Sequence, residues 1–145
     1  MKTIAILSCA IATILTSCVT TSPPPAAPSA ALIQAEKFPR PSVAAAKKAV
    51  MDSIYRTYKD PDSAVFRDFS VTDFGGVADT QGSWLFGYKV TCMMNIKNGR
   101  GAYGGYRRYA YIVIDGGLAT EIEGWRLNTR TYEHVPYVHR RFQRF

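Results

Sequence analysis

The stretch WLFGYKVTCMMNI, residues 84–96, decides the fold class of this 145-residue chain. Every second position, starting from the tryptophan, holds an apolar residue, without a break over thirteen residues. Alternation with a period of two is typical of a β-strand that buries one face. The stretch therefore predicts a long strand whose buried face carries Trp84, Phe86, Tyr88, Val90, Cys92, Met94 and Ile96.

A helix is predicted before this strand. Ser42 is a typical N-cap residue, and the alanine-rich run after it has high helix propensity. The helix should end at Lys59, because the next residue precedes a proline and is disfavoured in helical geometry. Its apolar side is expected to carry residues that recur at near-helical spacing, namely Val43, Val50, Ile54 and Tyr58.

Further strands complete the predicted fold. They are expected at 65–74, 109–114 and 118–123, with a loop at 75–82 and a hairpin turn at 115–117. The connections are too short for crossovers, so the sheet should be antiparallel. The fold class that follows is α+β, with one N-terminal helix packed on a three- to four-stranded antiparallel sheet.

Length and composition restrict the class of protein. The chain is 47% hydrophobic and 20% charged, which is typical of a single globular domain. Its net charge of +7 gives it a surface that attracts anions. The chain is too short for a barrel enzyme, a two-domain dinucleotide enzyme or a multi-span transporter.

Residues 1–17 are expected to form a lipoprotein signal peptide. Lys2 supplies a positive start, and the apolar run 3–15 is shorter than the ~20 residues that span a bilayer. The run ends in Leu-Thr-Ser-Cys18, which resembles the bacterial lipobox, whose cysteine receives acyl chains such as palmitate. The alternatives are ordinary cleavage after Ser29, with loss of Cys18, or an uncleaved membrane anchor. Because Ser29 lies far beyond the apolar run, we expect Cys18 to be the first residue of the mature chain.

The other cysteines and the next residue extend this prediction. Cys9 leaves with the signal peptide, so Cys92 has no partner within the mature chain and should be a buried, small hydrophobic residue. Val19, rather than aspartate, follows the lipidated cysteine. By analogy with enterobacterial sorting this predicts the outer membrane, on either its periplasmic or its surface face.

Proline marks the boundary between anchor and domain. Residues 18–40 hold the lipidated cysteine and a stretch rich in Pro, Ala and Ser, which predicts an extended tether without helix or strand. A globular domain is expected over 41–125. A basic, aromatic tail follows at 126–145, in which a last strand or a solvated end is expected.

A glycine- and tyrosine-rich loop lies between two predicted strands. It runs NIKNGRGAYGGY, residues 95–106, and its Gly99, Gly101 and Gly104 formally satisfy the dinucleotide-binding pattern GxGxxG. That pattern requires a helix after the glycines, whereas a β-rich run follows here. We therefore expect no nucleotide cofactor.

This loop and an earlier segment carry a resemblance to a known domain. The segments are DPDSAVFR, residues 60–67, and the loop itself, with Cys92 before it and Tyr109 after it. They resemble a small, uncharacterised bacterial domain of exported lipoproteins and phage-associated proteins, with hallmarks DPxSAxF and NxKNxxGxYxGY. The chain departs from it at Met93–Met94. The resemblance covers about residues 55–110, supports the domain boundary and implies no activity.

The loop has two interpretations. In the first, it is a hairpin loop whose glycines take positive φ and whose tyrosines fold back onto the sheet edge. In the second, it is a ligand surface, and Tyr103→Ala should then reduce binding without unfolding the domain. The candidate ligand-binding residues are Lys97, Asn98, Arg100, Tyr103, Tyr106, Arg107 and Arg108.

The sequence predicts no catalytic constellation, no metal site and no cofactor. Glu121 and Glu123 are expected on one strand face, where exposure explains them as well as a carboxylate pair would. The leading hypothesis is a membrane-anchored, non-enzymatic binding or assembly module of the envelope. Its expected partner is an envelope protein, a glycan or an anionic lipid, and no nucleic acid is expected. The alternatives are an envelope hydrolase or an inhibitor of one, and a phage- or plasmid-encoded lipoprotein that modifies the cell surface.

Overall fold

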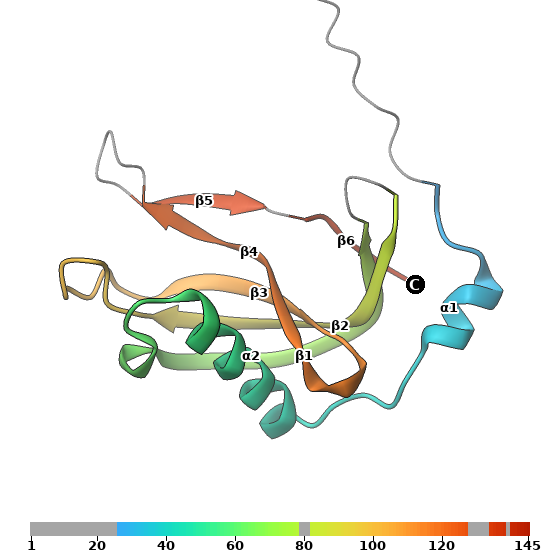
Figure 1. Ribbon diagram of the computed structural model, residues 1–145, viewed down its shortest axis with the longest axis horizontal. Helices are drawn as coiled ribbons and strands as arrows, with labels where there is room; N and C mark the ends of the chain where they lie inside the picture. Colours follow the sequence, from blue (N-terminus) through green and yellow to red (C-terminus); the bar gives the residue numbers. More distant parts are fainter. Residues whose placement is uncertain (1–25, 79–81, 128–133, 139) are drawn as a thin grey trace, which may run out of the picture.

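The computed structural model describes residues 26–78, 82–127, 134–138 and 140–145, which form an α+β fold (Figure 1). Two α-helices and six strands lie in these residues, so the predicted class is confirmed, whereas one helix and three to four strands are too few. The sheet is antiparallel, in the order β5-β4-β3-β2-β1-β6. The elements are α1 (Ala30–Glu36), α2 (Val43–Thr57), η1 (Pro61–Ser63), β1 (Val65–Ala78), β2 (Trp84–Asn95), β3 (Arg107–Val113), η2 (Asp115–Gly117), β4 (Ala119–Leu127), β5 (His134–Val138) and β6 (Phe142–Arg144).

Helix α2 begins where the sequence predicts. The Ser42 hydroxyl oxygen accepts a hydrogen bond of 3.1 Å from the backbone N–H of Ala45, which caps the helix. The buried side differs from the prediction, because Val43 is 53% exposed. The small Ala46 and Ala49 are buried with Val50 and Ile54 in its place. The helix thus lies against the sheet through two alanines together with the larger Val50 and Ile54.

Strand β2 has the predicted alternation. Its residues that face α2 are buried, and they are Phe86, Tyr88, Val90, Cys92 and Met94. The strand lies between β1 and β3, which pair with it over most of its length. Cys92 is only 2% exposed and has no disulfide partner among the described residues, so the prediction of a buried small residue is confirmed.

The predicted loop at 75–82 is wrong, because β1 continues through Gly75 and Gly76 to Ala78. This part of β1 pairs with β2 on one side and with β6 on the other. A Cβ atom at Gly75 would lie 2.1 Å from the backbone oxygen of Gln143. Glycine is therefore present because β6 approaches closely, not because the chain turns.

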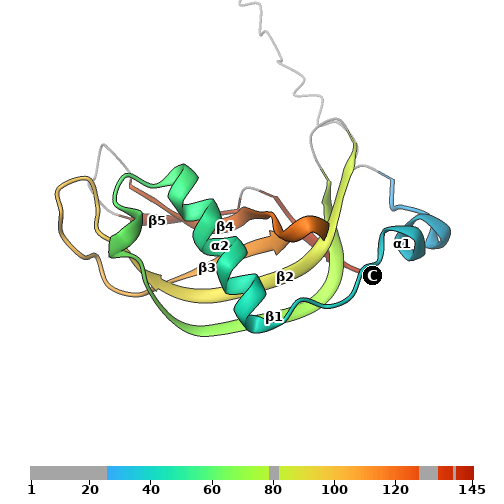
Figure 2. The same cartoon turned by 60° about the horizontal axis from the view of Figure 1, so that its bottom comes forward.

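The sheet curls, because only residues 139–141 link β5 and β6 although these strands lie at opposite edges (Figure 2). The curl brings apolar residues of distant strands together on the face that α2 does not cover. This second core contains Val77, Ala110, Ile112 and Ile122, with Leu85 and Phe142 packed against it. Both β5 and β6 come from residues 126–145, so that segment contributes to both edges of the sheet.

The tether prediction needs correction from residue 26 onward. Residues 30–36 form helix α1, capped by the Ser29 hydroxyl, which accepts a hydrogen bond of 3.2 Å from the Leu32 N–H. The Phe38 ring packs 5.3 Å from the Tyr88 ring, and the Tyr88 hydroxyl donates to the Phe38 backbone oxygen at 3.0 Å. Apolar contacts of this kind outweigh the extended preference of a proline-rich composition. Residues 26–41 are therefore attached to the domain.

Candidate functional site

The loop between β2 and β3 is held in shape by its own polar groups. The Asn98 side-chain oxygen accepts hydrogen bonds from the N–H groups of Arg100 (2.9 Å) and Ala102 (3.2 Å). The Gly101 N–H donates to the Asn98 backbone oxygen at 2.9 Å, and Gly101 has a φ of 76°. Asn98 is therefore committed to the turn, as is usual for an asparagine in this position.

The loop is fastened to the segment that precedes β1. The Tyr103 hydroxyl donates a hydrogen bond of 3.1 Å to the backbone oxygen of Ser63, and the Ser63 hydroxyl accepts one of 3.1 Å from the Lys97 N–H. The Lys97 ammonium group lies 5.6 Å from the centre of the Tyr103 ring. The segments 60–66 and 95–106 are thus joined in space. Tyr103 folds back onto the domain as the hairpin-loop interpretation expects.

A group of strand residues next to the loop lies on the sheet face opposite α2. Arg67 pairs with Met93 across β1 and β2, and Met93 pairs with Arg108 across β2 and β3. Paired residues point to the same face, and the adjacent Phe66 and Cys92 belong to the core under α2. The Arg67 guanidinium carbon lies 4.1 Å from the centre of the Tyr106 ring. We call Arg67, Met93, Tyr106 and Arg108 the arginine face.

A hollow of about 280 Å³ adjoins the arginine face, lined by Asp68, Thr91, Cys92, Met93 and Arg108. Asp68 has a φ of 53° and is the only non-glycine residue with a positive φ in the described part of the chain. It lies in an irregularity of the β1–β2 pairing between Arg67 and Ser70. Strain of this kind clusters at sites where a side chain must be aimed. Here the bulge places Asp68 beside the hollow that Arg108 also lines, and the Asp68 carboxylate lies 3.8 Å from the Arg67 guanidinium group.

The structure thus separates the seven predicted ligand-binding residues. Tyr106 and Arg108 lie together on the arginine face, whereas Lys97, Asn98 and Tyr103 build the loop and its attachment to Ser63. Arg100 is exposed near the loop tip. Arg107 pairs with the buried Met94 and faces the side of α2. Arg67 and Asp68 were not predicted as site residues, because only strand register and the bulge bring them to the loop.

A partly buried polar cluster lies under the C-terminal end of α2. The Glu121 carboxylate accepts hydrogen bonds from the hydroxyls of Tyr58 (3.0 Å) and Tyr111 (3.3 Å). Burial, followed by the charge of Glu121, raises the pKa of Cys92 to about 12 and that of Tyr109 to about 12. The same causes raise the pKa of Tyr111 well above its ordinary value. The thiol and both phenols therefore stay protonated well above neutral pH, and the Tyr111 hydroxyl keeps its hydrogen bond to Glu121.

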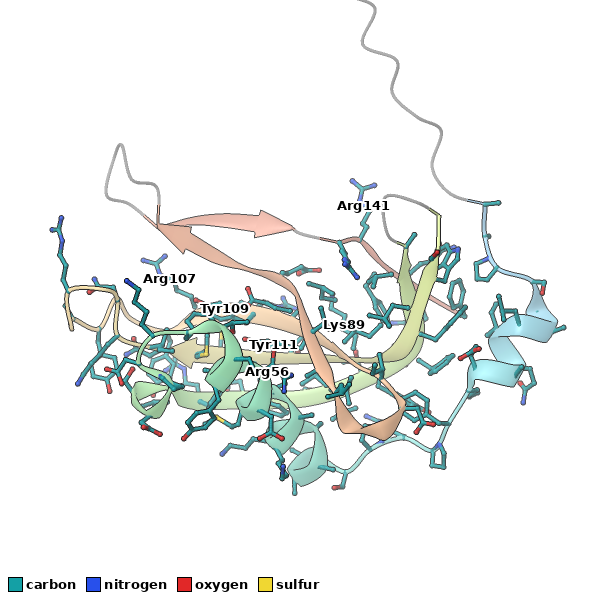
Figure 3. The ribbon with its side chains drawn as sticks, viewed as in Figure 1. Arg56, Lys89, Arg107, Tyr109, Tyr111 and Arg141 are labelled. Carbon is teal, nitrogen blue, oxygen red and sulfur yellow. The ribbon has the colours of Figure 1, made fainter. Side chains whose placement is uncertain are left out.

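The expectation that Glu121 and Glu123 share a face is wrong. Tyr111 pairs with Glu121 and Ala110 with Glu123, so Ile122 is an extra residue that forms a bulge in β4. Glu121 consequently faces α2. Glu123 points to the other face, where its carboxylate lies 3.0 Å from the Lys89 ammonium group. Figure 3 shows Lys89 and the buried Tyr111 in this region.

No model of a known protein family matches the chain, and neither the curated proteins nor the solved structures hold a significant match. Across the described ranges, no three or more His, Cys, Asp or Glu residues gather in a way that would hold a metal ion. None of the helices in those ranges is long and apolar enough to span a membrane. The arginine face is the arrangement on which we build a functional proposal.

Proposed function

We propose that the protein is a small outer-membrane lipoprotein whose domain is a non-enzymatic binding or assembly module of the bacterial envelope. In this proposal acyl chains on Cys18 attach the chain to the bilayer. Cys18 and the signal peptide lie outside the described residues, and their support is the lipobox-like sequence after the short apolar run. The arginine face is the proposed binding surface.

The observation that carries the proposal is that the tether and the arginine face lie at opposite ends of β2. The indole N–H of Trp84, the first residue of β2, donates to the backbone oxygen of Ala26 at 3.1 Å. Met93 of the arginine face lies near the last residue of the same strand. A strand rises about 3.3 Å per residue, so these ends are on the order of 30 Å apart along the strand. Figure 1 shows α1 at one end of the sheet and the β2–β3 loop at the other.

A chain anchored through Cys18 therefore presents the arginine face away from its own membrane. An arginine stacked on a tyrosine ring keeps its planar guanidinium group oriented, which suits a carboxylate or another planar or anionic group. Asp68 adds an acceptor for a hydroxyl or ammonium group. We infer that the partner is a carboxylate-bearing glycan or an acidic protein surface of the envelope.

A co-sedimentation assay with purified peptidoglycan sacculi, which carry free carboxylates, tests the binding surface. The double variant Arg67→Gln/Arg108→Gln should lose at least tenfold in affinity. The double variant Lys48→Gln/Arg56→Gln removes the same charge from exposed positions on α2 and should change affinity less than threefold. Equal affinity of the arginine-face variant and the wild type, or equal losses in both variants, would contradict the proposed surface.

The anchor is tested separately. Cys18→Ser should abolish incorporation of labelled fatty acid and release the protein from membranes into the soluble fraction. A thiol that mass spectrometry finds unmodified in the wild-type protein would contradict lipidation.

The alternative functions lack a comparable observation. An envelope hydrolase would be favoured by a pair of converging carboxylates, whereas Glu121 and Glu123 point to opposite faces. An inhibitor of such an enzyme and a phage- or plasmid-encoded surface protein remain compatible with the same binding face, and the identity of the captured partner distinguishes them.

A further inference from the structure

The end of the domain that holds the tether also holds the last strand. The Trp84 ring packs 5.4 Å from the Phe145 ring, and the Trp84 N–H is bonded to Ala26. Strand β6 pairs with Gly75–Val77 at this end, and the Phe145 N–H donates to the Phe74 backbone oxygen at 3.3 Å. Ala26 and the residues around β6 are therefore neighbours.

The chain between the anchor and this end is short. Eight residues lead from Cys18 to Ala26, and a proline-rich chain extends about 3.1 Å per residue, which gives a reach of about 25 Å. If Cys18 is lipidated, as proposed above, the end with Trp84 and β6 is held within this distance of the headgroups. The rest of the tether adds no reach, because α1 and Phe38 are attached to the domain.

The β6 side of this end is cationic, whereas the hollow beside Trp84 is lined by the acidic residues Glu36 and Asp115. Arg140, Arg141 and Arg144 lie in or beside β6. Arg141 is exposed, and Figure 3 shows it directed outward. The Arg144 side chain is 75% exposed and lies 2.7 Å from the Asp73 carboxylate, which neutralises part of the charge. Arginines near a membrane are attracted to anionic lipids over roughly one Debye length, about 8 Å at physiological ionic strength.

We infer that the end formed by Trp84 and β6 rests on the bilayer, where Arg141 and Arg144 bind the phosphate groups of anionic phospholipids. Charge alone does not select this end, because the whole chain has a net charge of +7. This end is distinguished because the tether meets the domain here and holds it close to the membrane. The inference rests on the proposed anchor and adds an orientation, in which β6 faces the membrane and the arginine face points away.

The first test uses the chain from Val19 onward, without acyl chains. The two apolar cores are built from residues between Ile33 and Phe145, so this chain retains every described core contact. Binding to vesicles that contain 30% phosphatidylglycerol in phosphatidylcholine is measured by sedimentation at 50 mM salt. Each bound arginine contributes about a fivefold gain in partitioning. Arg141→Gln/Arg144→Gln should therefore weaken binding about twentyfold.

The matched control is Lys48→Gln/Arg56→Gln. Each pair removes two exposed cations, and in each pair one cation has an exposed carboxylate partner, Asp52 for Lys48 and Asp73 for Arg144. The control should weaken binding less than threefold, and vesicles of phosphatidylcholine alone should bind neither protein. Equal losses in the two variants, or binding that does not depend on phosphatidylglycerol, would overturn the inference.

The second test uses the lipidated protein reconstituted in the same vesicles. Trp125→Phe leaves Trp84 as the one tryptophan of the chain, which contains two. Brominated lipids should quench Trp84 fluorescence, and Arg141→Gln/Arg144→Gln should reduce this quenching. If the wild-type protein carries no acyl chains but the unlipidated chain still binds the vesicles, the anchor is rejected and the membrane-binding end with β6 is retained. If the protein is acylated but brominated lipids do not quench Trp84, contact of the β6 end with the bilayer is rejected and the anchor is retained.

Discussion

The hydroxyl of Tyr103 donates a hydrogen bond of 3.1 Å to the backbone oxygen of Ser63, which joins the β2–β3 loop to the segment before β1. The Ser63 hydroxyl in turn accepts from the Lys97 N–H at 3.1 Å and donates to the Asp60 backbone oxygen at 2.7 Å. Two sequence segments that looked like separate motifs are therefore one local structure. Several of their polar residues serve the stability of the loop.

Tyr103→Phe should destabilise the domain by about 1 kcal/mol, because it removes this hydrogen bond and retains the ring. Urea unfolding monitored by circular dichroism measures the change. Tyr103→Ala removes the ring as well and should cost more, so a binding assay on that variant needs the folded fraction measured beside it. An unchanged urea midpoint for Tyr103→Phe would show that the hydrogen bond from Tyr103 to Ser63 does not stabilise the domain.

Gly75→Ala should destabilise the domain by about 2 kcal/mol, because its Cβ would lie 2.1 Å from the Gln143 oxygen and displace β6. Hydrogen exchange of the Phe145 N–H, which donates to Phe74, should become faster. Gly99→Ala is the control, since a Cβ there meets nothing within 4 Å, and it should change stability by less than about 0.5 kcal/mol. Similar effects of both substitutions would argue against the close approach of β6.

Glu121→Ala should destabilise the domain by about 2–3 kcal/mol, because the buried Tyr111 hydroxyl loses its acceptor. Glu123→Ala is the matched control on the same strand. Its ion pair with Lys89 is partly exposed, so the loss should stay below about 1 kcal/mol. Urea unfolding at pH 7 compares the two variants. Losses of equal size would mean that the bulge at Ile122 does not separate their environments.

The domain should lose stability in alkaline solution. Burial raises the pKa of Cys92 from 9.0 to about 12, so the folded state holds a proton that the unfolded chain releases above pH 9. This contribution is fully present below pH 9 and is lost as the pH rises toward 12, at about 1.4 kcal/mol per pH unit. Tyr109 and Tyr111, whose pKa values are also raised, add to the loss above pH 10.

The substitution Cys92→Ala measures how much of the alkaline loss of stability comes from the thiol. In the chain from Val19 onward, unfolding free energies measured in urea from pH 7 to 10 should fall between pH 9 and 10 for the wild type. The variant should lose less stability over that interval, because only Tyr109 and Tyr111 still contribute to the loss. Falls of equal size in the two proteins would show that the thiol ionises normally in the folded state.

Local patterns were sufficient for several elements. The alternation over residues 84–96 predicted β2 and its buried face, and the Ser42 cap predicted the start of α2. The buried state of Cys92 followed from its place in that alternation and from the cysteine count. These predictions hold because burial on one strand face and capping at one helix end depend on neighbours in the sequence.

Other features depended on residues far apart in the chain. The loop expected at 75–82 became strand because β6, contributed by residues 142–144, pairs with Gly75–Val77. Helix α1 formed in a proline-rich segment that packs against the domain through Phe38. Local composition does not reveal such pairings, because the partner strand or ring lies far away in the sequence from the segment whose structure it determines.

The sequence by itself determined an α+β domain with a central amphipathic strand, a capped helix, a buried thiol and a cationic loop. Tertiary structure alone decided which of the cations in and near the loop lie on one face. Strand register brought Arg67 and Arg108 to one face and sent Arg107 to the other, and the extra residue Ile122 separated Glu121 from Glu123. The physical reason is that side chains alternate with a period of two, so a single bulge reverses which face each later residue occupies.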